Sequence, residues 1–265
     1  QTTQRISPRE KQMPPTSFFS STSVSEDEAD IDDMESILED CRTLDIPSLQ
    51  LNWHYRSKHE SLIAFSNNEY YEGSLITFPS VDDQCTKVKY NYVEGVYDKG
   101  GRRSNRKEAE AIVAEIAKRL EMPDHAANSI GVIAFSVVQQ NLIEDLLLDL
   151  LDQNKKLREA AEEMYEPIFV KNLENVQGDE RDIILFSICY ANDKDGKFSM
   201  NFGPLNRAGG ERRLNVAITR SKRMVVVFAS IHGYNIDTNR TAAVGAAHLR
   251  SFLEYDEKGA TFATN

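Results

Sequence analysis

Two blocks in the last third of the chain combine residue types that suit the chemistry of phosphate groups. Residues 176–182 are Val-Gln-Gly-Asp-Glu-Arg-Asp, and residues 212–222 are Arg-Arg-Leu-Asn-Val-Ala-Ile-Thr-Arg-Ser-Lys. Glycine permits a sharp turn and a close approach, and the planar fork of arginine matches phosphate oxygens. Each block adjoins an apolar run that indicates a buried strand. A turn with an acid, then a helix that ends in a fixed arginine, suits a nucleotide-hydrolysing site where two domains meet.

Together the two blocks resemble motifs V and VI of superfamily 1 helicases, in the branch with Q-G-x-E and L-N-V-A-x-T-R. The resemblance implies that Arg220 is an arginine finger, which stabilises charge on the phosphoryl group of a nucleotide bound to another motor domain. It also implies that Gln177, Gly178 and Glu180 meet the ribose and phosphate side of the nucleotide. Arg213 would then brace either that acid or the nucleotide.

Residues 51–57, Leu-Asn-Trp-His-Tyr-Arg-Ser, resemble motif IV of the same family, and residues 65–75 continue the family pattern. The resemblance implies that Arg56 contacts the triphosphate. On its spacing alone, Arg56 would be a surface ion pair of little energetic consequence. The family tyrosine stacks near the base, so Tyr55 is a candidate for contact with nucleotide or nucleic acid.

Residues 130–139 resemble the next helicase block, I-G-V-I-T-P-Y-x-x-Q, whose threonine contacts the nucleic-acid backbone. Ala134 replaces that threonine here, which leaves Ser136 and Gln139 as the candidates for the contact. A strand end followed by a helix cap explains both residues equally well. Asn175, just before the Gln-Gly turn, is a further nucleic-acid candidate.

Residues 11–19 resemble the second half of motif III, usually G-D-x-K-Q-L-P-P. The family glutamine senses the terminal phosphate from the first motor domain, so the resemblance makes Gln12 a catalytic candidate. Pro8-Arg9-Glu10 replaces the expected Gly-Asp, so the match begins abruptly and residues 1–10 are expected to be foreign or altered. A proline-rich turn is the preferred interpretation for the chain on its own.

The sequence contains no G-x-x-x-x-G-K-S/T phosphate loop, and no apolar strand ends in paired acids that would hold magnesium. ATP and Mg²⁺ are therefore expected to be bound mainly by a first motor domain outside this chain, and the isolated chain is expected to be inactive. The 3 cysteines and 5 histidines lack metal-ligand spacing, so no metal site is expected.

The elements that must position these residues alternate along the chain. Strands are predicted at residues 49–53, 87–96, 129–135, 168–173, 183–190 and 225–229, and helices at 60–71, 105–120, 138–164, 212–222 and 242–255, the third of these in one piece or two. This alternation predicts an α/β fold with a mainly parallel sheet and helices on both faces. The helicase resemblance implies a RecA-like fold of the P-loop NTPase type that lacks its own phosphate loop.

Two regions are expected. Residues 1–47 would comprise the motif III remnant, a mobile Ser/Thr-rich and acidic linker, and an amphipathic helix, and residues 48–265 the C-terminal RecA-like motor domain. The net charge of −11 argues against a nucleic-acid binder, but nine of the 42 acids lie in residues 26–40, which contain no base. The remaining acids nearly balance the 31 bases, so the net charge does not exclude a basic groove.

The resemblance implies an ATP-dependent helicase or translocase whose partners are single-stranded DNA or RNA and the first motor domain of the same protein. No apolar run is long enough to span a bilayer, no secretory signal is visible and the cysteines are isolated, so a cytoplasmic protein without a membrane partner is expected. The main alternative is a non-catalytic nucleic-acid-binding or protein-docking module with a helicase-like fold. A nuclease is disfavoured because no Asp/Glu/Lys cluster is evident.

Overall fold

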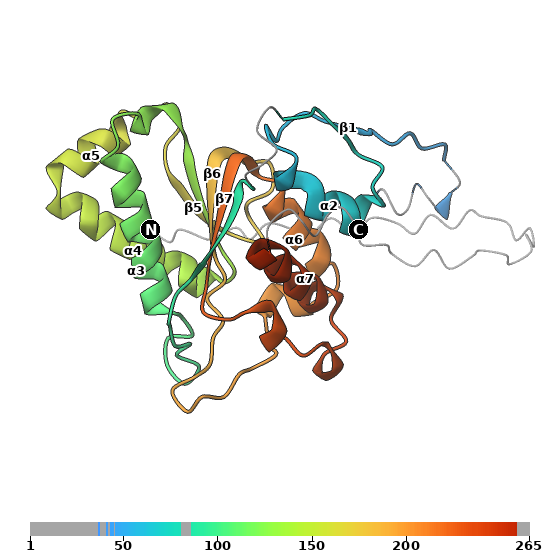
Figure 1. The fold of residues 1–265 in the computed structure, drawn as a ribbon. Helices are drawn as coiled ribbons and strands as arrows, with labels where there is room; N and C mark the ends of the chain where they lie inside the picture. The colour runs from blue at the N-terminus through green and yellow to red at the C-terminus, as the bar shows by residue number, and fades with distance from the viewer. Residues whose placement is uncertain (1–36, 38–40, 42, 45, 81–85, 259–265) are drawn as a thin grey trace, which may run out of the picture. The chain divides into compact units, whose positions relative to one another are not determined.

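The computed structural model describes residues 37, 41, 43–44, 46–80 and 86–258 (Figure 1). The chain divides into two compact units, Gln1–Gln50 and Leu51–Asn265. In the first unit, Ile37, Cys41 and Thr43 are helical. Most of the expected amphipathic helix, the acidic linker and Gln12 lie outside the described residues.

A five-stranded sheet forms the centre of the second unit, and all its neighbouring strands run parallel. The strand order is β3-β7-β6-β4-β5. The strands are β3 (Val88–Tyr92), β4 (Ile130–Ala134), β5 (Phe169–Asn172), β6 (Arg181–Ser187) and β7 (Ser221–Ala229). A separate parallel pair consists of β1 (Trp53–His54) and β2 (Ile76–Thr77).

Helices cover both faces of this sheet, which confirms the predicted α/β class (Figure 1). One face packs against α3 (Arg106–Leu120), α4 (Val137–Gln153) and α5 (Lys155–Glu162), and the other against α2 (Ser61–Tyr71), α6 (Gly210–Ile218) and α7 (Val244–Lys258). Successive side chains of a strand point to opposite faces. Ile184 and Phe186 of β6 therefore join the core beneath α2, α6 and α7, whereas Ile183 and Leu185 join the core beneath α3, α4 and α5.

The helix starts follow local capping chemistry. Asn105 caps α3 in an extended conformation and accepts a hydrogen bond from the backbone of Glu108, as the sequence predicts. Ser136 caps α4 in the same way, through the backbone N–H of Gln139. The long helix predicted from residue 138 is two helices, because Asn154 ends α4 and caps α5.

The helix predicted over residues 212–222 is wrong at its C-terminal end. Helix α6 stops at Ile218, and Ser221 and Lys222 belong to strand β7. The long-range pairing of Ser221 with Arg181 of β6 supplies the backbone hydrogen bonds that a longer helix would have supplied. This correction places Arg220 in the tight turn between a helix and a strand.

Short 3₁₀ turns, η1 (His125–Ala127), η2 (Gly203–Asn206), η3 (Gly233–Asn235) and η4 (Thr238–Arg240), complete the described elements. Within the described ranges, each helix is too short or too polar to cross a bilayer.

Candidate functional site

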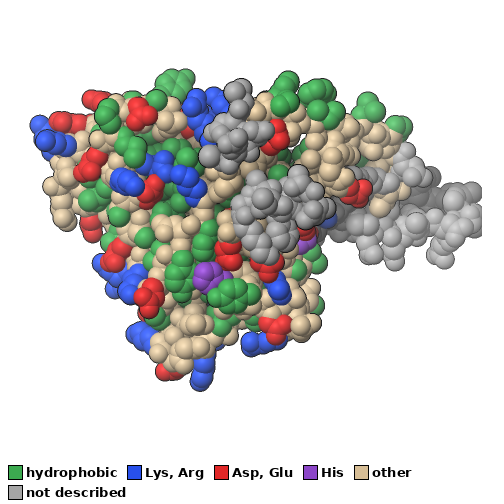
Figure 2. All heavy atoms as spheres, in the orientation of Figure 1, with side chains coloured by type: hydrophobic (Ala, Val, Ile, Leu, Met, Phe, Trp, Pro, Cys, Tyr) green, Lys and Arg blue, Asp and Glu red, His purple; other side chains and the backbone are tan. Residues whose placement is uncertain are grey.

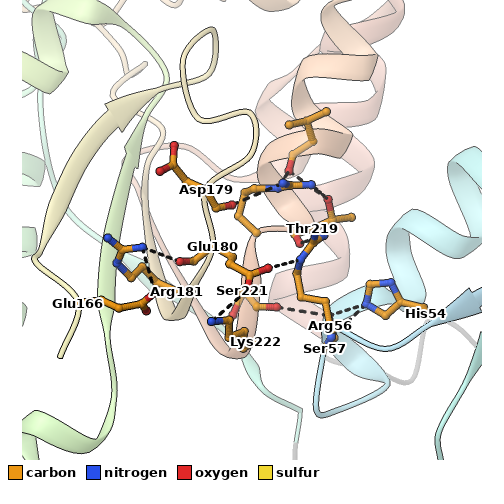
Figure 3. A network of polar contacts seen from close by, with 12 residues as sticks. His54, Arg56, Ser57, Glu166, Asp179, Glu180, Arg181, Thr219, Ser221 and Lys222 are labelled. Carbon is orange, nitrogen blue, oxygen red and sulfur yellow. Dashed lines mark hydrogen bonds and ion pairs between the residues drawn. The ribbon is translucent and has the colours of Figure 1, made fainter.

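A group of charged side chains gathers at the edge of the sheet where β6 and β7 begin (Figure 3). We call Arg56, Glu180, Arg220 and Lys222 the arginine cluster. Arg56 comes from the segment between β1 and α2, and Glu180 directly precedes β6. Arg220 lies between α6 and β7, and Lys222 is near the start of β7. The structure therefore unites residues from three distant parts of the sequence.

Arg56 and Lys222 share the carboxylate of Glu180. Nε of Arg56 is 2.8 Å from Oε2 of Glu180, and Nζ of Lys222 is 3.1 Å from Oε1. The hydrogen bond from Arg56 is the main reason that the pKa of Glu180 lies below its ordinary value, and Lys222 lowers the pKa further. Glu180 is therefore ionised at neutral pH and holds both cations in place.

Arg220 is held by neutral acceptors. Its Nε donates to the carbonyl oxygen of Val216 at 2.7 Å, and its Nη2 donates to Oγ1 of Thr219 at 3.1 Å. Nη1 lies 3.4 Å from the carbonyl oxygen of Asp179. The bond to Val216 satisfies a carbonyl in the last turn of α6, a favourable place for a cation. These contacts orient the guanidinium without pairing it to a carboxylate, although the nearby charge of Glu180 raises its pKa somewhat.

Thr219 joins the two arginines. Nη1 of Arg56 donates to the backbone oxygen of Thr219 at 3.2 Å, while Arg220 uses the hydroxyl of the same residue. Burial lowers the pKa of Arg220, and the nearby positive charge of Arg56 lowers it further. The cluster thus holds like charges side by side, an arrangement that an anion would stabilise.

The cluster contains three cations and one carboxylate, so it carries a net positive charge. Among the ion pairs of the described residues, none joins Arg220 to a carboxylate. Arginine forks and a lysine suit the phosphates of a nucleotide. Magnesium fits less well, because Glu180 is already shared and no group of three His, Cys, Asp or Glu in the described part of the chain could hold a metal.

The Gln177-Gly178 turn leads into the arginine cluster. Gly178 has a φ of 91°, and a Cβ built there would meet nothing within 4 Å. Backbone conformation rather than crowding therefore favours glycine at this position. Gln177 is exposed at the tip of the turn, and Asp179 forms an ion pair with Lys171 of β5.

Arg213 lies apart from the cluster contacts. It is in the N-terminal part of α6, and its Nη1 donates to the backbone oxygen of Ala208 in the preceding loop at 2.9 Å. Seven-residue spacing predicts that Arg213 and Arg220 share a helix face. The prediction is wrong because α6 ends before Arg220.

The nucleic-acid candidates are dispersed. Ser136 lines a cavity of about 440 Å³ where β4 and β5 end. Tyr55, next to Arg56, is 84% exposed, and Asn175 is exposed in the loop between β5 and β6. Gln139 is fully buried, where its side chain bonds to the backbone of Asn105 and to Ser187. Gln139 is therefore a structural residue here and does not present its amide to a ligand.

Sequence reasoning missed residues at both sites. It assigned no site role to Lys222, although this side chain forms an ion pair with Glu180. It also gave no role to Arg207, which lines the 440 Å³ cavity together with Lys99 and Arg103 of a basic loop. The sequence signal for that loop is its Lys-Gly-Gly-Arg-Arg composition, whereas nothing local marks Arg207.

Comparisons with known proteins identify the family of this chain. A family model described as an AAA domain matches residues 34–232. The chain is 34% identical over 260 residues to the uncharacterized ATP-dependent helicase MG140 of Mycoplasma genitalium, covering 93% of this chain and 22% of that protein. It is 27% identical to DNA polymerase alpha-associated DNA helicase A of Saccharomyces cerevisiae, covering 79% of this chain and 30% of that protein. It is 28% identical to the regulator of nonsense transcripts 1 homolog of Arabidopsis thaliana, covering 74% of this chain and 16% of that protein. The chain thus spans less than a third of each relative.

Proposed function

The chain belongs to the family described as an AAA domain, and on that basis we propose that it is the second motor domain of an ATP-dependent superfamily 1 helicase or translocase. In the full-length protein, it supplies Arg220 as an arginine finger and Arg56 as a second phosphate ligand. A first motor domain supplies the phosphate loop and the magnesium site that this sequence lacks. The names of two relatives support this proposal, because the M. genitalium protein is called an ATP-dependent helicase and the S. cerevisiae protein a DNA helicase.

The guanidinium of Arg220 carries this proposal, because it is fixed beside Arg56 and none of the ion pairs among the described residues joins it to a carboxylate. Phosphoryl transfer spreads negative charge over the oxygens of the transferred group. Donors that are oriented in advance stabilise this charge without reorganising at the moment of reaction. Val216, Thr219 and Asp179 orient Arg220 in this way, and Glu180 does the same for Arg56.

Each residue then has a defined part. ATP bound with Mg²⁺ to the first motor domain supplies the phosphoryl group. Arg220 acts on the transition state, Arg56 binds the phosphates in both the ground state and the transition state, and Glu180 positions Arg56. Gln177 and Gly178 form the turn that approaches the ribose side. Arg213 is proposed only to brace the loop before α6, through its bond to Ala208.

We place single-stranded DNA or RNA at the opposite edge of the sheet, over the 440 Å³ cavity. Lys99, Arg103 and Arg207 provide positive charge there, of which the Arg207 charge is shared with Glu174, and Ser136 provides a hydroxyl. Phosphate contacts of this kind supply affinity that does not depend on sequence. Asn175 stays a candidate, while Tyr55 is proposed for the nucleotide because of its place beside Arg56. A cytoplasmic location, which fits the free Cys41 and Cys189, is part of the proposal.

ATP hydrolysis by two samples tests the proposal. The pure isolated chain should release no phosphate above background, with or without oligonucleotide, because it has no phosphate loop. The full-length protein should hydrolyse ATP in a magnesium-dependent reaction that nucleic acid stimulates. Phosphate release by the isolated chain that Arg220→Ala abolishes would contradict the half-site assignment. A full-length protein without ATP hydrolysis would instead be a non-catalytic nucleic-acid-binding or docking module.

A further inference from the structure

A patch of large apolar side chains is exposed beside the arginine cluster. We call Leu51, Trp53, Ile76 and Phe78 the Trp53 patch. Their exposed fractions are 90%, 58%, 45% and 65% respectively. The Trp53 and Phe78 rings lie 5.4 Å apart between centroids, and Trp53 pairs with Ile76 across β1 and β2. Figure 2 shows hydrophobic side chains along the upper edge of the molecule in the region of β1.

This arrangement is unusual for a free surface. A contiguous group of exposed apolar side chains marks an interaction site more often than isolated ones do. A two-stranded ribbon is also marginally stable unless something packs on it. β1 and β2 contribute two residues each, so their aromatic side chains have little support from backbone pairing. A partner that covers Trp53 and Phe78 would stabilise the ribbon and remove both rings from water.

We propose that the Trp53 patch is the docking surface for the first motor domain, an inference that rests on the proposed function. The patch adjoins the arginine cluster along the chain, because Arg56 is only three residues after Trp53. A domain that presents a nucleotide to Arg56 must therefore lie next to Trp53. Much of the relatives' polypeptide is available for this role, since the chain spans 22% of the M. genitalium protein.

The apolar patch and the charged cluster have different roles in this arrangement. Aromatic side chains in the centre of an interface contribute a large share of its binding energy. The Trp53 patch anchors the first motor domain whether or not nucleotide is bound. The arginine cluster engages only when a nucleotide supplies phosphate charge. Docking and hydrolysis therefore respond to different substitutions.

Fluorescence quenching of the isolated chain is the first measurement. Trp53 is the only tryptophan in the sequence, so the emission reports on this patch alone. Acrylamide should quench Trp53 readily in the isolated chain, as expected for an exposed indole. Protection from acrylamide would show that the patch is already covered in the isolated chain and would overturn the proposal.

Photo-cross-linking in the full-length protein identifies what covers the patch. p-Benzoylphenylalanine replaces Phe78 in one variant and Leu148 in a control; Leu148 is 61% exposed on α4, across the sheet. Position 78 should cross-link to the domain with the phosphate loop, and position 148 should not. Cross-links from position 78 to residues 1–265 of the same molecule, or to an isotope-labelled second copy, would overturn the proposal. Equal cross-linking from positions 78 and 148, or no cross-link from position 78, would overturn it as well.

Two further variants separate this inference from the proposed function. Phe78→Ser should raise the KM for ATP on the order of tenfold, because the domains meet less often in the closed state. Arg220→Ala should lower kcat and leave the position 78 cross-link intact. If position 78 cross-links but Arg220→Ala does not change ATP hydrolysis, the docking surface stands and the arginine finger is refuted. If Arg220→Ala lowers ATP hydrolysis but position 78 does not cross-link, only the docking surface is refuted.

Discussion

Arg56 and Glu180 are 124 positions apart in the chain, yet Nε of Arg56 lies 2.8 Å from Oε2 of Glu180. The two side chains are 28% and 40% exposed, so the contribution of this ion pair to stability is small. Its consequence is positional. Glu180 fixes the guanidinium of Arg56 at the turn that also carries Arg220, where both arginines reach Thr219.

Glu180→Gln tests this positional role. The substitution should change the free energy of unfolding by less than about 1 kcal/mol. It should lower kcat of the full-length ATPase by roughly tenfold or more, because a misplaced phosphate ligand stabilises the transition state poorly. Denaturant unfolding and steady-state kinetics measure the two effects. Glu166→Gln is the control, since Glu166 lies 3.7 Å from Arg181 and outside the cluster. Unchanged kcat in Glu180→Gln would remove Glu180 from the mechanism.

The pH dependence of this pair has a definite sign. The folded-state pKa of Glu180 is depressed, so its small contribution to stability is present above the ordinary carboxyl pKa. That contribution is lost as the pH falls through the lowered folded-state value.

Glu108 should give the opposite dependence on pH. Burial raises the pKa of this carboxyl to about 8, although hydrogen bonds from Ser187 and Cys189 act against the shift. Between the ordinary value of 4.5 and about 8, the folded state binds a proton that the unfolded state has lost. The free energy of unfolding should therefore fall with rising pH, by up to about 1.4 kcal/mol per pH unit.

Comparison of the wild type with Glu108→Gln isolates this effect. Asp256 is also buried with a raised pKa, so the wild-type profile alone would mix two groups. Urea unfolding from pH 5 to pH 9 should show that Glu108→Gln removes the Glu108 component and leaves that of Asp256. Parallel profiles for both proteins would mean that Glu108 titrates at the same pH in the folded and unfolded chains.

Local sequence patterns predicted much of the fold. Apolar runs located the strands of the parallel sheet, and Asn105 with Glu108 located the start of α3. The pattern failed at residues 219–222, because the start of β7 depends on pairing with β6, which a local pattern does not contain. The strand order, with β7 between β3 and β6, likewise depends on long-range contacts.

The candidate site was predicted less completely. Family resemblance selected Arg56, Glu180 and Arg220, but spacing alone could not indicate that Arg56 and Arg220, which are far apart in the chain, both bond to Thr219. Gln139 shows the converse limit. A glutamine near a helix start has the same sequence signal whether it meets a ligand or the core. Its burial depends on the distant residues Asn105 and Ser187.

Binding of single-stranded nucleic acid by the isolated chain should be weak and sensitive to salt, because one motor domain supplies only part of a groove. Arg207→Ala should weaken binding of an unstructured oligonucleotide and reduce the slope of log affinity against log salt by about one. Arg158→Ala, which removes the ion-pair partner of Asp152 at the opposite end of α4 from Ser136, should leave the slope unchanged. Fluorescence anisotropy at several salt concentrations gives both values. Sub-micromolar affinity that survives high salt would indicate a complete site in this chain.

The arginine-finger assignment predicts a specific order of effects among three variants of the full-length protein. Arg220→Ala should lower kcat by roughly 10³-fold or more, while nucleotide affinity changes far less. Arg220→Lys should also have a low kcat, because an ammonium group does not reproduce the guanidinium fork. Arg213→Ala should lower kcat less than Arg220→Ala does, since Arg213 bonds to the loop before α6 and not to the cluster.

The most direct measurement is therefore kcat for ATP hydrolysis by Arg220→Ala and Arg213→Ala at saturating nucleic acid. We expect turnover to collapse in Arg220→Ala and largely to persist in Arg213→Ala. Near wild-type turnover in Arg220→Ala with a loss in Arg213→Ala would assign the finger to the other arginine. Turnover retained in both variants would contradict the proposal that this domain completes an ATP site.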